Sequence, residues 1–292
     1  MKQKLNKAIS FKIQKSDQHA LLVQHDQGPY FYDKLHYHPE FQITAIIKGE
    51  GIFYAGNNMS TYSNKAVFLI GSGTPHLLKN ADQYYTKNSP GVESISLFFD
   101  HYSFGKQFFD ISEMAGLKTL LQSSNRVIKV SGAKQDEIYN KIIAITSKTK
   151  EELVIAFLEI LSLIKKAKKE FINSAQYQLV LNDDEGGRLN DVLNYTFKHS
   201  KTDISLEDIT RVAHLSRSQF SKFFKAHTGK TYIQFLNELR IENACVLLGN
   251  TNSTIEQICY ETGFKNVSNF VRQFKKVKKE TPSGYRRGLH FR

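Results

Sequence analysis

The sequence predicts a multidomain α+β protein in which an N-terminal β-barrel is followed by helices and then by an all-α C-terminal domain with two helix-turn-helix units. Three observations lead to this fold class. The chain has 292 residues, which is more than one hydrophobic core usually serves. Its N-terminal half alternates short β-rich runs with turn residues, and its C-terminal third contains one helical pattern twice.

The barrel is predicted from residues 20 to about 99, where β-rich runs are separated by turn formers such as Gly56-Asn57-Asn58. Glycine and asparagine at these points favour backbone reversal. Short strands at such spacing close most readily into a barrel or jelly roll. The predicted strands cover residues 41–48, 51–55, 66–70 and 94–99.

A helical region and a linker follow the barrel. Apolar residues recur at helical spacing from 134 to about 180, which predicts two helices that pack on the barrel or on a second subunit. Residues 183–188 combine charge and glycine without an apolar anchor, so they are the predicted linker. The predicted parts of the chain are therefore a barrel domain (1–110), a helical dimerisation or connecting region (111–182), the linker (183–188) and the C-terminal domain (189–292).

One helix-turn-helix pattern occurs twice in the C-terminal domain. In the first copy, Ser205 followed by Asp208 resembles a capping box, and Ser216 caps a second helix. The second copy repeats the arrangement, with one cap predicted at Ser253 and another at Asn266. A helix, a short turn and a second helix with a polar, basic outer face is the layout in which the second helix can lie in a major groove.

A single helix over residues 231–248 is predicted between the two copies. At 1.5 Å per residue it is about 27 Å long, so it could hold two second helices near the roughly 34 Å repeat of one DNA turn. The charge distribution favours a polyanionic partner. The chain carries a net charge of +12, and residues 190–292, with 17 Lys and Arg against 9 Asp and Glu, carry +8 of it.

These C-terminal residues resemble the DNA-binding domain of the AraC/XylS family of bacterial transcription regulators over about residues 189–290. The sequence departs from the family pattern at residues 278–280, where a glycine usually precedes Thr-Pro, and at Cys259, where alanine is usual. These departures are expected to alter local packing only. The resemblance implies a sequence-specific, double-stranded-DNA-binding regulator of transcription that is not an enzyme. The matching segments are 205–209, 215–220, 224–225, 228–229, 239–244, 255–259, 263–264, 270–276 and 281–286.

In that family the base-reading positions lie on the exposed face of each second helix. Lysine and arginine can donate to guanine, serine can bond base edges or phosphates, and valine can only touch a thymine methyl. For any single cation, a solvated surface role is the alternative. Matching the family implies that the base-reading residues are Ser218, Ser221, Lys222, Val267, Ser268, Val271 and Arg272. The residues predicted to contact phosphates are Ser216, Arg217, Lys225, Lys265, Asn266, Lys275 and Lys276.

Histidines flank two of the predicted barrel strands. His36 and His38 precede strand 41–48, and His76 follows strand 66–70. This spacing resembles the cupin pattern, which implies a cupin-like jelly-roll sensor domain over about residues 20–100. The position four residues after His38 holds Gln42, a poor anionic ligand, so no metal and no cofactor are predicted. Instead we expect His36, His38, Gln42 and His76 to hydrogen-bond a small ligand, or the histidines only to stabilise the barrel.

The remaining predictions concern partners and location. Cys245 and Cys259 make neither a disulfide framework nor a zinc site, as in a reduced cytoplasmic protein. The longest apolar run, 153–164, is too short to cross a bilayer core of about 30 Å, so no membrane is involved. The family resemblance implies a homodimer, a small-molecule effector such as a sugar, and RNA polymerase as a further partner. Two other functions stay open: a metal-dependent cupin enzyme fused to a DNA-binding domain, and a nucleoid-type DNA-binding protein with a structural barrel.

Overall fold

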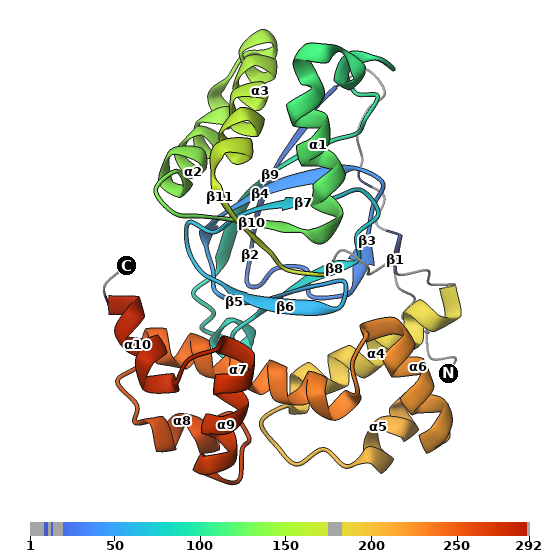
Figure 1. Cartoon of the computed structure of the whole chain (residues 1–292), viewed down its shortest axis with the longest axis vertical. Coiled ribbons are helices and arrows are strands. Elements are labelled where there is room, and N and C mark those ends of the chain that lie inside the picture. Colours follow the sequence, from blue (N-terminus) through green and yellow to red (C-terminus); the bar gives the residue numbers. More distant parts are fainter. Residues whose placement is uncertain (1–8, 11–12, 14–19, 175–182, 291–292) are drawn as a thin grey trace.

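The computed structural model describes residues 9–10, 13, 20–174 and 183–290, and it confirms the predicted fold class. In Figure 1 the barrel lies between two groups of helices. One group contains α1 (Ala115–Ser123), α2 (Gln135–Ile143) and α3 (Lys150–Lys166). The other group is formed by the C-terminal helices, which lie against the opposite side of the barrel.

The strands of the barrel agree closely with the prediction. Those predicted at 41–48 and 51–55 have these bounds, whereas those predicted at 66–70 and 94–99 begin at Val67 and Val92. The observed strands are β1 (Ile9–Ser10), β2 (Leu22–Gly28), β3 (His36–Tyr37), β4 (Phe41–Lys48), β5 (Gly51–Ala55), β6 (Asn58–Tyr62), β7 (Val67–Ile70), β8 (His76–Asn80), β9 (Val92–Phe99), β10 (Ile128–Ser131) and β11 (Lys168–Phe171). Short 3-10 helices lie in the connections: η1 (Asp82–Tyr85), η2 (Phe108–Asp110), η3 (Ser112–Met114), η4 (Ser124–Arg126) and η5 (Ala144–Ser147).

The described strands form two sheets. A five-stranded sheet has the order β1-β3-β8-β5-β6, and a six-stranded sheet has the order β11-β10-β7-β4-β9-β2. Strands β5 and β8 approach very closely at Gly51, where a Cβ atom would lie 2.0 Å from the carbonyl oxygen of Lys79. Only glycine permits this approach.

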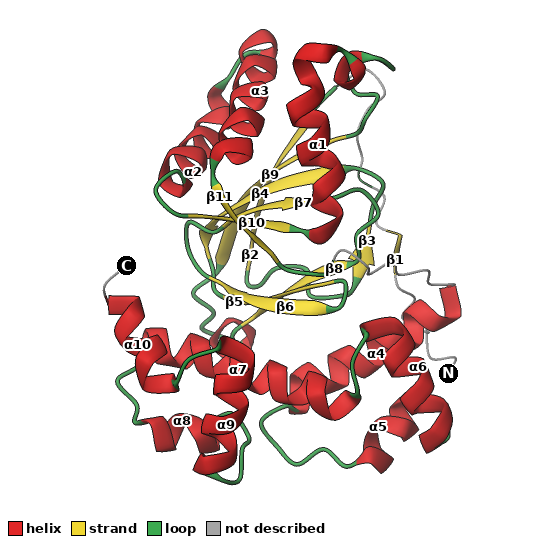
Figure 2. Ribbon diagram, viewed as in Figure 1, coloured by secondary structure: helices red, strands yellow, loops and turns green. Residues whose placement is uncertain are grey.

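The outer face of the six-stranded sheet is covered by helices, as Figure 2 shows. Along β4, Ile43 and Ala45 pack into an apolar core with α1, α2 and α3, whereas Gln42 and Thr44 line the barrel interior. This alternation follows from the two-residue period of a strand. The prediction of two helices in the 134–180 region is confirmed by α2 and α3.

Two details of the connecting region differ from the prediction. Residues 168–171 form β11, which pairs with β10 in antiparallel register, so a ladder in the sheet overrides the helical pattern there. Residues 183–188 are not an irregular linker, because they form the first turns of α4 (Asp183–His199). Gly186 and Gly187 are buried, so packing rather than helix propensity stabilises this segment. Residues 175–182 lie outside the described part of the chain.

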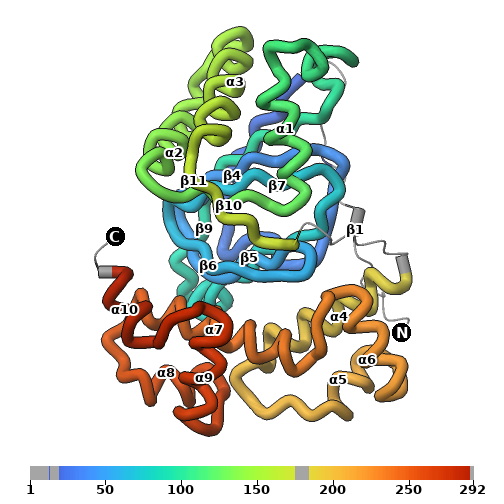
Figure 3. Tube along the Cα trace, in the orientation of Figure 1, coloured from blue at the N-terminus to red at the C-terminus, as the bar shows by residue number. Residues whose placement is uncertain are grey.

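The C-terminal domain contains the two predicted helix-turn-helix units, joined by the predicted long helix. The first unit is formed by α4, α5 (Leu206–Ala213) and α6 (Arg217–Thr228), and the second by α8 (Ile255–Glu261), α9 (Val267–Lys278) and α10 (Pro282–His290). The connecting helix is α7 (Tyr232–Asn250), which in Figure 3 runs from one unit to the other.

Most of the predicted helix caps are confirmed. Ser205 with Asp208 and Ser216 with Gln219 form capping boxes, and Asn266 caps α9. The cap predicted at Ser253 with Glu256 is wrong. The cap of α8 is Thr254, whose hydroxyl oxygen accepts from the backbone N–H of Gln257 at 3.1 Å.

The departure from the family pattern at residues 278–280 has a clear structural consequence. Helix α6 ends on Gly229 with φ +69°, whereas α9 ends on Lys279 with φ +64°, a conformation that disfavours a side chain. The preceding residue, Lys278, donates to both carboxylate oxygens of Glu242 on α7, at 2.6 and 2.7 Å. Glu242 is only 3% exposed, so this ion pair lies inside the second unit.

The first unit packs directly on the barrel. Its core residues belong to one apolar cluster with barrel residues that include Leu35, Ile52, Tyr54 and Leu77. The second unit has a separate apolar core that contains no barrel residue among the described ones. Within the same described ranges, none of the helices is both long and apolar enough to span a membrane.

Candidate functional site

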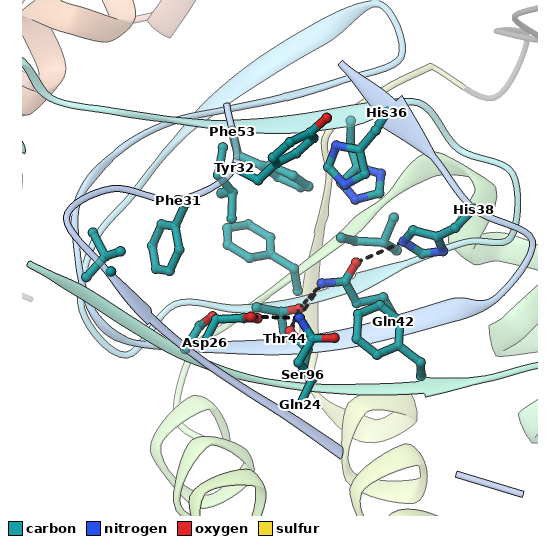
Figure 4. Close-up of a pocket in the computed structure, with 18 of the residues that line it drawn as sticks. Gln24, Asp26, Phe31, Tyr32, His36, His38, Gln42, Thr44, Phe53 and Ser96 are labelled. Atoms are coloured by element: carbon teal, nitrogen blue, oxygen red, sulfur yellow. Dashed lines mark hydrogen bonds between the residues drawn. The ribbon is translucent and has the colours of Figure 1, made fainter. Parts of the chain in front are cut away.

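A cavity of about 230 Å³ lies inside the barrel, and it is lined by all four residues that the sequence predicted as ligand contacts. Figure 4 shows His36, His38, Gln42 and the aromatic ring of Phe53 around this space. His36 comes from β3, Gln42 from β4, and His76 from β8, where it pairs directly with His36. Two sheets therefore bring together residues that are far apart in the sequence.

The three histidines form a compact cluster. The ring centroids of His36 and His76 are 4.3 Å apart, and those of His38 and His76 are 5.2 Å apart. In each ring Nδ1 lies 2.8 to 3.0 Å from a backbone carbonyl oxygen, that of Lys34, Glu40 or Thr74. A carbonyl can only accept a hydrogen bond, so in the neutral rings of His36 and His76 Nδ1 carries the proton and Nε2 is left as an acceptor.

Burial keeps these imidazoles neutral. Desolvation lowers the pKa of His36 to about 4, and it lowers the pKa of His38 and His76 as well. For His76, the nearby rings of His36 and His38 lower the pKa further. At neutral pH the cluster therefore offers hydrogen-bonding nitrogen atoms rather than positive charge.

Gln42 connects the histidines to a row of polar groups on the opposite sheet. Its terminal amide lies 3.1 Å from Nε2 of His38, and it also bonds the hydroxyls of Thr44 and Ser96, at 2.6 and 3.2 Å. The amide NH₂ group donates to the two hydroxyls, and the amide oxygen faces Nε2 of His38, which donates to it when that nitrogen carries a proton. The dashed lines in Figure 4 follow this chain of contacts.

Four polar residues of the pocket, on strands β2, β4 and β9, were not predicted from the sequence. Gln24 and Asp26 on β2 line the pocket and are joined by a hydrogen bond of 2.6 Å, and Thr44 and Ser96 also line it. The signal was present in the two-residue period, because Gln42 and Thr44 alternate with apolar residues along β4. Aromatic side chains complete the walls of the pocket: Phe31, Tyr32, Phe53, Phe68 and Phe98.

The histidine cluster also meets some requirements of a metal site. His36, His38 and His76 each offer one nitrogen, and these atoms lie within 4.8 Å of one another. Neutral imidazoles whose other nitrogen donates to a carbonyl are suitable metal ligands. However, the cupin pattern expects a carboxylate four residues after His38. That position holds Gln42, whose amide supplies no negative charge. The absence of a metal therefore stays a prediction.

The predicted base-reading residues lie on α6 and α9 but differ in exposure. Ser218, Ser221 and Lys222 on α6 are exposed, as are Ser268 and Arg272 on α9. The two remaining residues, Val267 and Val271, are half-buried and pack against the apolar core of the second unit. On α9, exposed polar chemistry is thus concentrated at Ser268 and Arg272.

Four of the predicted phosphate contacts already have intramolecular partners. The side chains of Ser216 and Asn266 cap α6 and α9. Arg217 pairs with Glu207, and Lys265 lies 2.6 Å from Asp203. Both ion pairs are exposed, so they contribute little stability and can exchange for a phosphate at small cost. The other three predicted contacts, Lys225, Lys275 and Lys276, are exposed on the same two helices.

Comparisons with known proteins cover both domains. A family model described as an AraC-like ligand binding domain matches residues 18–89, and one described as a helix-turn-helix domain matches residues 209–288. An HTH-type transcriptional regulator of Staphylococcus aureus strain COL is 27% identical over 251 residues, which are 84% of this chain and 31% of that protein. The chain thus spans about a third of the length of that relative.

One further relative and one solved structure are matched along most of their length. YdeC of Bacillus subtilis strain 168, an HTH-type transcriptional regulator, is 24% identical over 268 residues, covering 88% of this chain and 87% of YdeC. The crystal structure of ToxT from Vibrio cholerae O395 covers 92% of this chain and 98% of ToxT, at 15% identity and a TM-score of 0.37. The match to YdeC extends over the barrel as well as the helical domain.

Proposed function

Since the chain belongs to the AraC-type family of helix-turn-helix transcription regulators, we propose that it reads operator DNA with α6 and α9 under the control of a small molecule bound in the barrel. In this proposal Lys222 and Arg272 read guanine, the serines beside them read bases or phosphates, and Val267 and Val271 touch thymine methyl groups. The remaining predicted cations and both helix caps contact phosphates. The site of action is the cytoplasm, where a bacterial promoter is found.

The observation that carries the proposed control is that a single sheet separates the pocket from the first helix-turn-helix unit. Phe53 on β5 and His76 on β8 line the pocket. Their sequence neighbours Tyr54 and Leu77 point the other way and belong to the apolar cluster shared with the first unit. The ring of Tyr54 lies 5.7 Å from that of Phe235 on α7. A ligand that displaces the pocket side of this sheet must therefore disturb the docking side.

The same sheet reaches the end of the first recognition helix. The turn between β5 and β6 approaches Gly229, the C-cap of α6, where a Cβ atom would lie 3.4 Å from Nδ2 of Asn57. The next residue in each segment forms a hydrogen bond of 2.9 Å, from Nζ of Lys230 to Oδ1 of Asn58. Movement of β5 would thus be transmitted to the position of α6.

The pocket chemistry supports a small, uncharged, polyhydroxylated effector such as a sugar. Neutral histidines, amides and hydroxyls can donate to or accept from ligand hydroxyl groups, and aromatic walls can pack on the apolar face of a sugar ring. We propose binding without a metal cofactor. Metal analysis of the purified protein checks this point, and a stoichiometric transition metal would contradict it.

The proposed regulator is a homodimer that contacts RNA polymerase as a further partner. Helices α2 and α3 are proposed as the dimer interface, supported by Ile155 on α3, which is 60% exposed. Sedimentation at increasing concentration tests the dimer. A monomer throughout would reject it.

Selection of bound sequences from random duplex DNA tests the DNA-reading part of the proposal. At about 0.15 M salt, where non-specific attraction is screened, the intact protein should enrich two motifs about one helical turn apart. Arg272→Ala should lose the preference in one motif only. Failure to enrich any sequence would favour the nucleoid-type alternative.

A ligand screen tests the control. An effector present at about one hundred times its Kd should raise the free energy of unfolding by about 2.7 kcal/mol and change the affinity for the selected operator. Gln42→Met should lose both responses and still bind DNA. Gln122→Met is the matched control, because Gln122 is exposed on α1, and it should keep both responses. A response retained by Gln42→Met would reject the pocket as the control site.

A further inference from the structure

Among the described residues, the two helix-turn-helix units have separate apolar cores, and α7 contributes to both. The N-terminal half of this helix contributes Phe235 and Leu239 to the first core, and its C-terminal half contributes Ala244 and Leu248 to the second. Among the described residues, no buried apolar side chain belongs to both cores. A single helix holds two bodies only as rigidly as it resists bending and twisting, and helices in proteins do bend. Another connection is needed to fix the rotation between the units.

Arg240 lies on α7 between these two groups of core residues and provides such a connection. Its Nε donates to the carbonyl oxygen of Ser200 at 2.7 Å, and its Nη2 donates to that of Thr202 at 2.8 Å. Both carbonyls belong to the loop between α4 and α5 in the first unit. The guanidinium carbon lies 5.8 Å from the ring centroid of Phe264, a core residue of the second unit. One side chain therefore contacts both units.

The turn of the second unit packs against the same loop. Gly263 has φ +91°, and a Cβ atom there would lie 2.7 Å from the carbonyl oxygen of Ser200 and 3.0 Å from Nε of Arg240. Only glycine permits this approach. An exposed ion pair of 2.6 Å between Lys265 and Asp203 crosses the same boundary. Because exposed pairs contribute little, the contacts made by Arg240 and the close approach at Gly263 dominate this connection.

We propose that Arg240 is a positioning residue that fixes the distance and rotation between α6 and α9, and thereby the spacing between the two halves of the operator. It reads no base in this role. The inference rests on the proposed reading by both helices. One added base pair rotates the second half-site by about 35° and moves it by about 3.4 Å. A rigid connection therefore tolerates one spacing, whereas a loosened one tolerates several.

The experiment measures affinity against spacing with the full-length protein. Duplexes carry the two motifs selected by the wild-type protein, separated by the selected spacing or by one or two base pairs more or fewer. The wild-type protein should lose tenfold or more in affinity at each change of one base pair. Arg240→Met, which keeps the apolar stem of the side chain, should lose threefold or less in affinity at each change of one base pair. Selection from random DNA with this variant should still return the same bases within each motif.

Two further variants separate positioning from folding. Arg286→Met removes an arginine that also donates to a backbone carbonyl, that of Ser253 at 2.7 Å, but within the second unit alone, and it should keep the steep dependence on spacing. Arg240→Lys keeps the charge, but its single ammonium group lacks the two separate N–H donors with which the guanidinium bonds both carbonyls. Like Arg240→Met, this variant should weaken the dependence of affinity on spacing. It serves as the test if Arg240→Met fails to fold.

Each result supports or overturns a different one of these roles. A flat dependence on spacing with unchanged base preference supports the positioning role. A dependence as steep as that of the wild-type protein in both Arg240 variants overturns this inference alone. If the wild-type protein enriches a single motif, the two-helix reading is wrong and this inference is overturned with it.

Discussion

The two helix-turn-helix units share one pattern but differ in their surroundings. The core of the first unit is continuous with the barrel sheet through Tyr54 and Leu77, whereas the core of the second is closed and includes a buried ion pair between Lys278 and Glu242. The same local sequence pattern thus produces one unit that can respond to the barrel and one that is stabilised independently. We expect an effector to act on the first unit and leave the second largely unchanged.

The largest effect is expected from truncating matching core residues of the two units. Phe224 and Phe274 are both fully buried, so replacing either with alanine should cost roughly 3–5 kcal/mol of stability. Phe224→Ala should also abolish the effector response, because Phe224 belongs to the cluster shared with the barrel. Phe274→Ala should remove recognition of one motif and spare the response. Urea unfolding and sequence selection with each variant measure this, and equal loss of the response in both would show that the units are not distinct.

The second prediction concerns the buried ion pair between Lys278 and Glu242 in the second unit. Burial lowers the pKa of Lys278, but its interactions with neighbouring groups, Glu242 foremost, together raise it by more, so the net shift is upward. Lys278→Met should cost about 3 kcal/mol, because it leaves a buried carboxylate without its partner. The double variant with Glu242→Leu should recover most of this loss. In the first unit the residue before the C-cap is Thr228, whose hydroxyl donates to the carbonyl of Phe224 at 2.7 Å. Thr228→Val is therefore the matched variant in the first unit, and it should cost less stability than Lys278→Met.

A third, intermediate effect is expected from pH at the sheet on which the first unit docks. The pKa of His36 is about 4 in the folded protein against a reference value of 6.5. The unfolded chain therefore binds more protons between these values, so the stabilisation is fully present above pH 6.5 and falls as the pH decreases toward 4. For His36 alone the loss between pH 7 and pH 5 is about 2 kcal/mol. His36→Gln should flatten this part of the pH profile of unfolding, and an unchanged profile would contradict the neutral cluster.

The smallest effect is expected at the ends of the recognition helices. Lys279 holds the left-handed conformation at the C-cap of α9 that Gly229 holds at the C-cap of α6. Lys279→Gly should stabilise the protein by up to about 1 kcal/mol, because it relieves the side-chain penalty in this conformation. Gly229→Ala should have the opposite effect, since alanine at this position takes on that penalty. Thermal unfolding compares the two variants, and a destabilised Lys279→Gly variant would contradict the left-handed conformation of Lys279.

Much of the local structure could be predicted from the sequence. Turn residues and two-residue periods located the principal strands, and the caps Ser216 and Asn266 located the recognition helices to within a residue or two. These features depend on hydrogen bonds within a few residues of chain, which a local pattern records. The errors lie where long-range packing decides. β11 pairs with β10 instead of continuing a helix, and the predicted linker is helical because its glycines are buried.

For the candidate sites, the sequence by itself determined which residue types were available: three histidines and Gln42 for the barrel, and a polar, basic face for each recognition helix. Only the tertiary structure decided that Thr44, Ser96, Gln24 and Asp26 share the pocket, because β2, β4 and β9 are separated in the sequence and become neighbours only in the folded sheet. It also decided that the pocket wall is the docking surface of the first unit, and that Arg240 spans the boundary between the units. Such contacts join residues far apart in the chain, and their free energy depends on packing that no local pattern specifies.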